Sequence, residues 1–183
     1  MQHIIIAIDG FSGCGKSTTA RQVAQILNYR YIDTGAMYRA VTLYFLDNNV
    51  DPADSVAVDN ALEKMEVTFH TDENGISSAF LNGQNVEDQI RSMRVAGQVS
   101  RISAIPAVRK AMVRQQHLMG AKRGLVMDGR DIGTVVFPDA ELKIFLTADI
   151  KIRAERRQHE LREKGIVVEL DEIIQNLYSR TSR

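Results

Sequence analysis

Residues Gly10 to Ser17 read GFSGCGKS, which fits the G-x-x-x-x-G-K-[ST] pattern of a phosphate-binding P-loop. The sequence on either side fits as well. His3–Ile8 is a short, β-branched run typical of a buried parallel strand. After the loop, apolar residues recur at the spacing of a helix, at Ala20, Val23, Ala24 and Leu27. Strand, glycine loop and helix in this order predict that the chain binds a nucleoside triphosphate.

The chemistry of such a loop depends on its backbone and on two side chains. Glycines let the backbone wrap a phosphate with its N–H groups pointing inward, and the following helix N-terminus adds unpaired donors and partial positive charge. Lys16 is expected to reach the β- and γ-phosphates, and the Ser17 hydroxyl is expected to bind Mg²⁺. Cys14 is expected to fill space, because nothing in this chemistry needs a thiol nucleophile.

Composition and charge narrow the class of protein. The 183 residues include 23 Lys and Arg against 23 Asp and Glu, so the balance gives no sign of a nucleic-acid or membrane-surface partner. No apolar stretch reaches the length of a membrane-spanning helix, and Ile4–Ile8 is too short for a signal peptide. The single cysteine excludes an internal disulfide and fits a reducing cytoplasm. We therefore expect one cytoplasmic domain.

Alternating strand and helix patterns predict a three-layer α/β core with a parallel sheet, as in P-loop NTPases. Further strands are expected at 29–33, 125–128 and 142–146, with the last two buried. Helices are expected over Met37–Phe45 and at about 55–64, 91–104, 106–120, 150–164 and 169–180. Residues 66–90 predict a small inserted antiparallel sheet, because Asn82-Gly83 suits a type I′ hairpin turn.

Polar residues follow two of the predicted parallel strands, at Asp33–Arg39 and Asp128–Asp131. The carboxyl ends of these strands should meet beside the P-loop. Arg39 and Arg130 suit bidentate recognition of a phosphate, and Asp128 lies where a carboxylate would hold Mg²⁺. The alternative interpretation is that the carboxylates cap turns and the arginines lie on the surface. That alternative requires two charged clusters to reach the same sheet edge by accident.

Three segments resemble bacterial cytidylate kinases, which are nucleoside monophosphate kinases: GFSGCGKST (10–18), DTGAMYR (33–39) and MDGRDIGTVVFPDA (127–140). The last two are specific to that family rather than to P-loops at large. The resemblance implies a cytoplasmic enzyme that converts ATP and CMP or dCMP into ADP and CDP or dCDP with Mg²⁺. It implies a monomer at full length, without nucleic-acid or membrane partners. It also implies a core at 1–52 and 121–149, an acceptor-binding subdomain at 53–120 and a helical lid at 150–180.

The resemblance also assigns roles to individual residues. The residues that would cradle the ATP phosphates are Gly10, Phe11, Ser12, Gly13, Cys14, Gly15, Lys16, Ser17 and Thr18. Those that would hold the acceptor nucleotide are Thr34, Arg39, Ser100, Arg109, Arg130, Asp131 and Arg180. Within that set, Arg39 and Arg130 would hold the α-phosphate, and Ser100, Arg109 and Asp131 would meet the cytosine. The lid candidates are Arg153, Arg156 and Arg157. The expected catalytic residues are Lys16, Arg39, Arg130, Arg156 and Arg157, and the expected metal ligands are Ser17 and Asp128.

The chain departs from the family pattern at its end. The family usually continues with an R-D-x-x-D-x-x-R stretch, a further core strand and a final helix. Tyr178–Arg183 instead reads YSRTSR, with Thr181 in place of the first aspartate. We therefore expect a parallel sheet that lacks one strand, with an edge that is bare or covered by another chain. Whether this chain catalyses phosphoryl transfer stays an open question at this point. Two alternatives also stay open: a kinase for another small acceptor such as UMP or AMP, and a nucleotide-binding module without catalysis.

Overall fold

The computed structural model describes residues 3–73, 75–163 and 165–181, apart from the side chains of 179–181. Its strands are β1 (Ile5–Gly10), β2 (Arg30–Asp33), β3 (Val67–Thr71), β4 (Ser77–Leu81), β5 (Gln84–Asn85), β6 (Leu125–Gly129) and β7 (Leu142–Leu146). Its longer helices are α1 (Lys16–Leu27), α2 (Thr34–Asp47), α3 (Ser55–Glu63), α6 (Pro106–Gly120), α7 (Ile150–Glu163) and α8 (Leu170–Thr181). Short helical segments are η1 (Gln89–Arg91), α4 (Met93–Ala96), α5 (Val99–Ile102) and η2 (Ile132–Val136).

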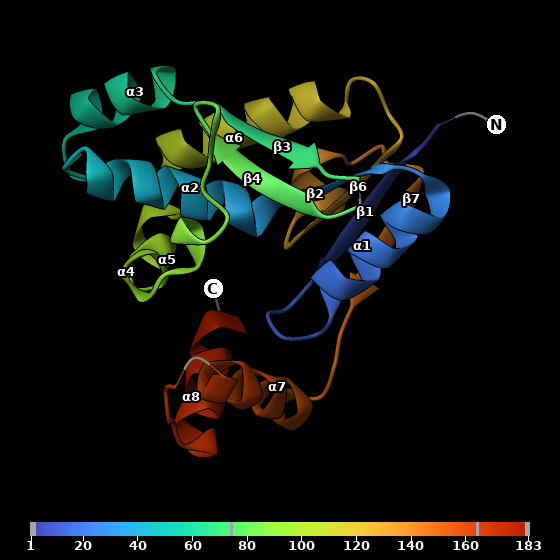
Figure 1. Ribbon diagram of the computed structural model, residues 1–183, viewed down its shortest axis with the longest axis vertical. Helices are drawn as coiled ribbons and strands as arrows, with labels where there is room; N and C mark the ends of the chain where they lie inside the picture. The colour runs from blue at the N-terminus through green and yellow to red at the C-terminus, as the bar shows by residue number, and fades with distance from the viewer. Residues whose placement is uncertain (1–2, 74, 164, 182–183) are drawn as a thin grey trace.

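The central sheet has the strand order β2-β6-β1-β7, and each neighbouring pair is parallel. Alternate residues of β1 face opposite layers, as the period of a strand requires. Ile6 and Ile8 pack in a cluster with Ala20 and Ala24 of α1, whereas Ile5 and Ala7 belong to the larger cluster formed with α2 and α6. The predicted three-layer α/β arrangement is confirmed (Figure 1).

Parallel pairing brings the chemistry-bearing segments to one edge of this sheet. The P-loop follows β1, helix α2 follows β2, and the Arg130-Asp131 turn follows β6. In the register, Asp33 lies opposite Asp128, and Asp9 lies opposite Gly129. The carboxyl edge is where ligands bind in open α/β sheets.

The insert forms a second sheet with the order β3-β4-β5, and both of its strand pairs are antiparallel. Asn82 and Gly83 join β4 to β5 with φ angles of 49° and 80°, which a type I′ turn requires at both positions. This confirms the predicted hairpin. Phe45, Val67 and Met112 belong to the same buried cluster as Ile5, so the insert shares its core with one face of the parallel sheet.

Helices α7 and α8 form a separate pair joined to the carboxyl end of β7, and Figure 1 shows them below the rest of the molecule. Ala154, Ile173 and Leu177 form the buried centre of their own small apolar cluster. The pair touches the P-loop through the first half of α7. Among the described helices, none is long and apolar enough to span a membrane.

Two details of the sequence prediction are wrong. The helix expected at 91–104 is instead η1, α4 and α5, with α4 ending at Ala96 before its C-cap Gly97, because glycine costs about 1 kcal/mol in a helix interior. Strand β7 is not buried, because it lies at the edge of the described sheet, and Phe145 is 61% exposed. The helix expected from the spacing of Ala20, Val23, Ala24 and Leu27 is present as α1, and Leu27 is 44% exposed at its last turn.

Candidate active site

The P-loop leaves the first turn of α1 open to a ligand. Gly15 occupies the N-cap position with φ 95°, and no side chain caps the helix. The N–H groups of that first turn therefore remain available, and the helix dipole favours an anion there. Gly10, with φ 147°, lies so close to β7 that a Cβ would sit 2.0 Å from the Leu146 carbonyl oxygen. Only glycine fits at that position.

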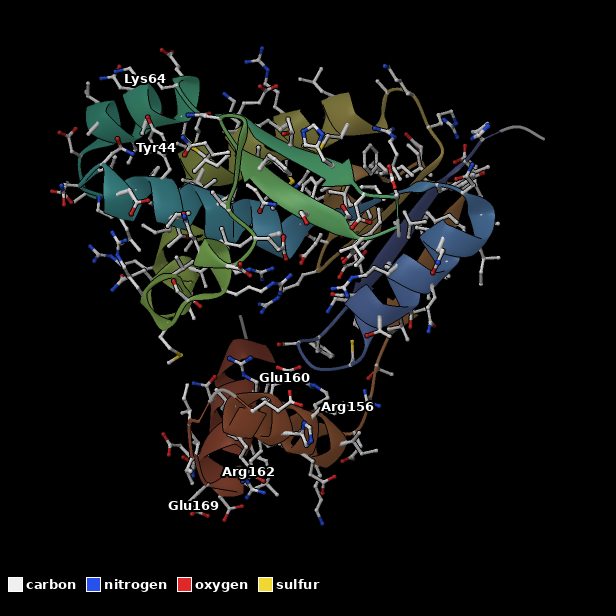
Figure 2. All side chains as sticks on the ribbon, in the orientation of Figure 1. Tyr44, Lys64, Arg156, Glu160, Arg162 and Glu169 are labelled. Atoms are coloured by element: carbon white, nitrogen blue, oxygen red, sulfur yellow. The ribbon has the colours of Figure 1, made fainter. Side chains whose placement is uncertain are left out.

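Three cationic side chains donate to carbonyl oxygens of this loop. Lys16 Nζ lies 2.8 Å from the Phe11 oxygen, Arg153 Nε lies 2.9 Å from the Ser12 oxygen, and Arg156 Nη1 lies 3.3 Å from the Gly13 oxygen. Arg153 is buried and places its guanidinium 5.1 Å from the centre of the Phe11 ring. Figure 2 shows Arg156 on α7. Thr18 is exposed, whereas Cys14 is buried.

Asp128 connects the P-loop with the acceptor side of the site, by which we mean the segments after β2 and β6 that carry the predicted acceptor residues. Its Oδ2 accepts the Ser17 hydroxyl at 3.0 Å, and its Oδ1 accepts the Tyr31 hydroxyl at 2.8 Å. Its backbone carbonyl accepts the Thr34 hydroxyl at 2.8 Å. One residue of β6 is thus tied to α1, β2 and α2, so both predicted metal ligands and one predicted acceptor residue lie together.

The electrostatics of Asp128 fit a cation site. Burial, followed by repulsion from Asp33, raises the pKa of Asp128 to about 6, although hydrogen bonds from Tyr31 and Ser17 and the charge of Lys16 act in the other direction. Burial and the same two carboxylates raise the pKa of Tyr31. A buried carboxylate beside a hydroxyl suits Mg²⁺, which takes oxygen ligands and shares its shell with phosphates and water. No described cluster of three His, Cys, Asp or Glu side chains offers a more complete protein cage.

Two arginines of the predicted acceptor set, Arg39 and Arg109, are held by carboxylates. Arg39 Nη2 lies 2.9 Å from Asp33 Oδ2, while Asp33 Oδ1 caps α2 by accepting the Ala36 N–H at 2.9 Å. Arg109 Nη2 lies 2.6 Å from Asp131 Oδ2, and this hydrogen bond raises the pKa of Arg109. The structure thus brings two predicted acceptor residues, Arg109 and Asp131, into contact with each other, and it pairs a third, Arg39, with Asp33.

The remaining predicted residues are not part of these contacts. Arg130 is exposed at the end of β6, and within the described residues nothing pairs with it. Ser100 is exposed on α5. Arg157 Nη1 lies 3.0 Å from Glu160 on the exposed surface of α7, so it does not reach the P-loop. The side chain of Arg180 lies outside the described residues.

Tyr31 and the double role of Asp33 were not anticipated from the sequence. The Tyr31 contact depends on the pairing of β2 with β6, which sets Tyr31 opposite Val126, whereas the two Asp33 contacts are local, with Ala36 and Arg39 of the following helix. Side chains two residues apart on a strand share a face, so Tyr31 reaches Asp128 diagonally. The available signal was the alternation Tyr31, Asp33 on a strand predicted to end at the same sheet edge as the strand that ends in Asp128.

The chain is similar to known proteins over nearly its whole length. A family model described as cytidylate kinase matches residues 6–183. A protein named cytidylate kinase from Cytophaga hutchinsonii is 55% identical over 181 residues, which cover 98% of this chain and 77% of that protein. Proteins of the same name from Bacteroides fragilis and Flavobacterium johnsoniae are 52% and 48% identical, each covering 98% of this chain and 80% of the relative.

Proposed function

The chain belongs to the cytidylate kinase family, and from this premise we propose that it transfers the γ-phosphoryl group of ATP to CMP or dCMP, giving ADP and CDP or dCDP. Family membership makes it an enzyme of the nucleoside monophosphate kinase class. The observation that best supports the specific reaction is the position of Asp128. It contacts Ser17 of the P-loop helix and Thr34 of the acceptor helix, so donor and acceptor segments meet at one residue.

The reaction needs no general base. A phosphate oxygen of CMP attacks the γ-phosphorus of ATP, a new P–O bond forms, and the bond between that phosphorus and the β–γ bridging oxygen breaks. The attacking phosphate is already largely dianionic at neutral pH because its second pKa is about 6. The protein therefore has to align two polyanions and offset the charge of the transferring group.

On the donor side, we assign the ATP phosphates to the P-loop backbone and to Lys16. Among the described residues, the Lys16 ammonium group donates hydrogen bonds to a neutral carbonyl and a thiol rather than to a carboxylate, so it can turn to the β- and γ-phosphates at little cost. Arg156 is already at the loop, while Arg157 has to leave Glu160 when the lid closes. Closure of 150–180 would also exclude water, which otherwise competes with CMP as acceptor.

On the acceptor side, we assign the phosphate of CMP to Arg39 and Arg130, whose guanidinium groups suit bidentate contact. Ser100, Arg109 and Asp131 would read the cytosine edge. Asp131 fits that role because its carboxylate is oriented by Arg109 and can accept from the cytosine amino group. Thr34 and Arg180 complete the proposed acceptor set, and 53–120 is the proposed acceptor-binding subdomain.

Ser17 and Asp128 would hold Mg²⁺, because their oxygens are adjacent and the buried carboxylate lacks a full counter-charge. When bound, Mg²⁺ neutralises charge on the β- and γ-phosphates. We further propose that the enzyme acts in the cytoplasm as a monomer at full length, on small-molecule substrates without nucleic acid or a membrane. The balanced charge and the single buried cysteine support this proposal.

A coupled ADP-release assay with CMP, dCMP, UMP and AMP in parallel tests the proposal, with Lys16→Ala as the blank for contaminating kinases. We expect kcat/KM for CMP or dCMP to exceed that for the other acceptors by at least about tenfold, since an acceptor site that hydrogen-bonds one base rejects another. A preference for UMP or AMP would indicate a different kinase. ATP binding without transfer to any acceptor would indicate a binding module.

A further inference from the structure

Asp9 is a buried carboxylate at the end of β1 that the reaction scheme above does not use. It is 7% exposed and directly precedes Gly10, the first residue of the P-loop. Both of its oxygens accept backbone N–H groups from a single turn: Oδ1 from Ile132 at 2.7 Å and Oδ2 from Gly133 at 2.8 Å. That turn, η2, begins immediately after Arg130 and Asp131.

The turn lies flush against this carboxylate. A Cβ at Gly133 would sit 3.3 Å from Asp9 Oδ2 and 3.0 Å from Lys143 Cδ, so Gly133 is in close contact on both sides. The turn is also tied to the residue that precedes it, because the Val135 N–H donates to the Asp131 carbonyl at 2.8 Å. A continuous set of hydrogen bonds therefore runs from Asp9 through η2 to Asp131.

From this arrangement we infer that Asp9 is a positioning residue for the acceptor nucleotide, holding the Arg130-Asp131 turn in place against the P-loop strand. The inference rests on the proposed roles of Arg130 and Asp131. Charge-assisted hydrogen bonds that a buried carboxylate accepts are stronger than neutral ones, and removing this acceptor leaves two buried N–H groups without partners. The turn would then shift, and the two side chains at its start would lose their alignment with CMP.

Two substitutions at Asp9 remove its hydrogen bonds to different extents. Asp9→Asn keeps the size of the side chain and one carbonyl acceptor, but its NH₂ group places a donor opposite a backbone N–H, which is also a donor. Asp9→Ala removes both acceptors. We expect KM for CMP to rise about tenfold in Asp9→Asn and further in Asp9→Ala, while KM for ATP stays within about twofold of the wild-type value.

Asp54 provides a matched control. Its Oδ1 also accepts two backbone N–H groups, from Val56 at 2.9 Å and Ala57 at 3.1 Å, but it caps α3 away from both loops. Asp54→Ala therefore removes the same number of backbone hydrogen bonds from a solvent-exposed position, and we expect KM for CMP to stay unchanged. Equal effects of Asp54→Ala and Asp9→Ala on KM for CMP would overturn the inference, because general destabilisation would then explain both.

Amide hydrogen exchange at Ile132 and Gly133 tests the contact independently of turnover. We expect slow exchange in the wild type and faster exchange in both Asp9 variants. Unchanged exchange, or faster exchange with unchanged KM for CMP, would overturn the inference while wild-type activity stayed intact. Failure of the proposed function is a different result: the wild-type chain would then release no ADP with CMP, although Ile132 and Gly133 exchanged slowly.

Discussion

Two helices begin at the same edge of the parallel sheet, and their N-termini differ. Helix α1 starts at Gly15, which has φ 95° and no capping side chain, whereas α2 starts at Asp33, whose carboxylate accepts the Ala36 N–H. The N-terminus of α1 is therefore open to the anion of a ligand, whereas the N-terminus of α2 already contacts the Asp33 carboxylate. A phosphate can therefore be bound by backbone N–H groups on the donor side but must be bound by side chains on the acceptor side.

The cations of the two sides differ in the same way. Lys16 donates to a neutral carbonyl oxygen, while Arg39 and Arg109 are paired with Asp33 and Asp131. A phosphate that reaches Lys16 displaces a weak acceptor. A phosphate that reaches Arg39 competes with a carboxylate at 2.9 Å. We expect the donor side to contribute mainly to transfer and the acceptor side to contribute to both binding and transfer.

Lys16→Ala is the strongest test of this division. The ammonium group is proposed to meet charge that develops on the transferring phosphoryl group, so we expect kcat to fall by about 10²–10³-fold. The Kd for CMP, measured by calorimetry, should stay within about twofold of the wild-type value because no described acceptor residue contacts Lys16. Loss of CMP affinity in this variant would contradict the separation of the two sides.

Arg130→Ala tests the acceptor side. We expect KM for CMP to rise and kcat to fall, with kcat/KM for CMP lower by about 10²-fold, because a charge-assisted bidentate contact is lost in both the ground state and the transition state. KM for ATP should not change. Arg114→Ala, which removes an exposed arginine on α6, is the control. Unchanged constants in Arg130→Ala would remove this residue from the site.

The same comparison explains how much the sequence predicts. The P-loop is contiguous, and helix α6 has the bounds expected from Pro106 and Gly120, since local signals define both. The Tyr31 contact with Asp128 joins residues 97 positions apart and depends on which strands pair. Likewise, the exposure of Phe145 depends on the place of β7 in the strand order. Local chemistry was predictable, while contacts set by strand order and register were not.

Asp128→Asn tests the electrostatics at the junction of the two sides. The pKa of Asp128 is raised from 3.8 to about 6, so the folded state binds a proton more tightly than the unfolded state between these values. Stability from this group is therefore greatest below about pH 4 and is lost as the pH rises to about 6. In Mg²⁺-free buffer, we expect the variant to be more stable than wild type by about 3 kcal/mol at pH 7.5, with little difference at pH 4.

Urea unfolding of both proteins at the two pH values measures this difference, and Asn preserves the geometry. Its amide oxygen can accept from Tyr31, and its NH₂ group can donate to the Ser17 hydroxyl oxygen. A variant less stable than wild type at pH 7.5 would show that the hydrogen bonds of the charged carboxylate outweigh its burial.

Asp33→Asn gives the smallest expected effect and sharpens the comparison most directly. The amide oxygen can still accept the Ala36 N–H, so the cap of α2 is kept, while the negative charge beside Arg39 is lost. Loss of this partly buried ion pair should cost about 0.5–1 kcal/mol of unfolding free energy. If the CMP phosphate competes with Asp33 for Arg39, its Kd should fall by about two- to threefold, because a negative neighbour has been neutralised. Calorimetric titration with CMP measures this. Weaker binding would mean instead that Asp33 orients the guanidinium for the phosphate, and that the acceptor side, like the donor side, is preorganised rather than blocked by its own carboxylate.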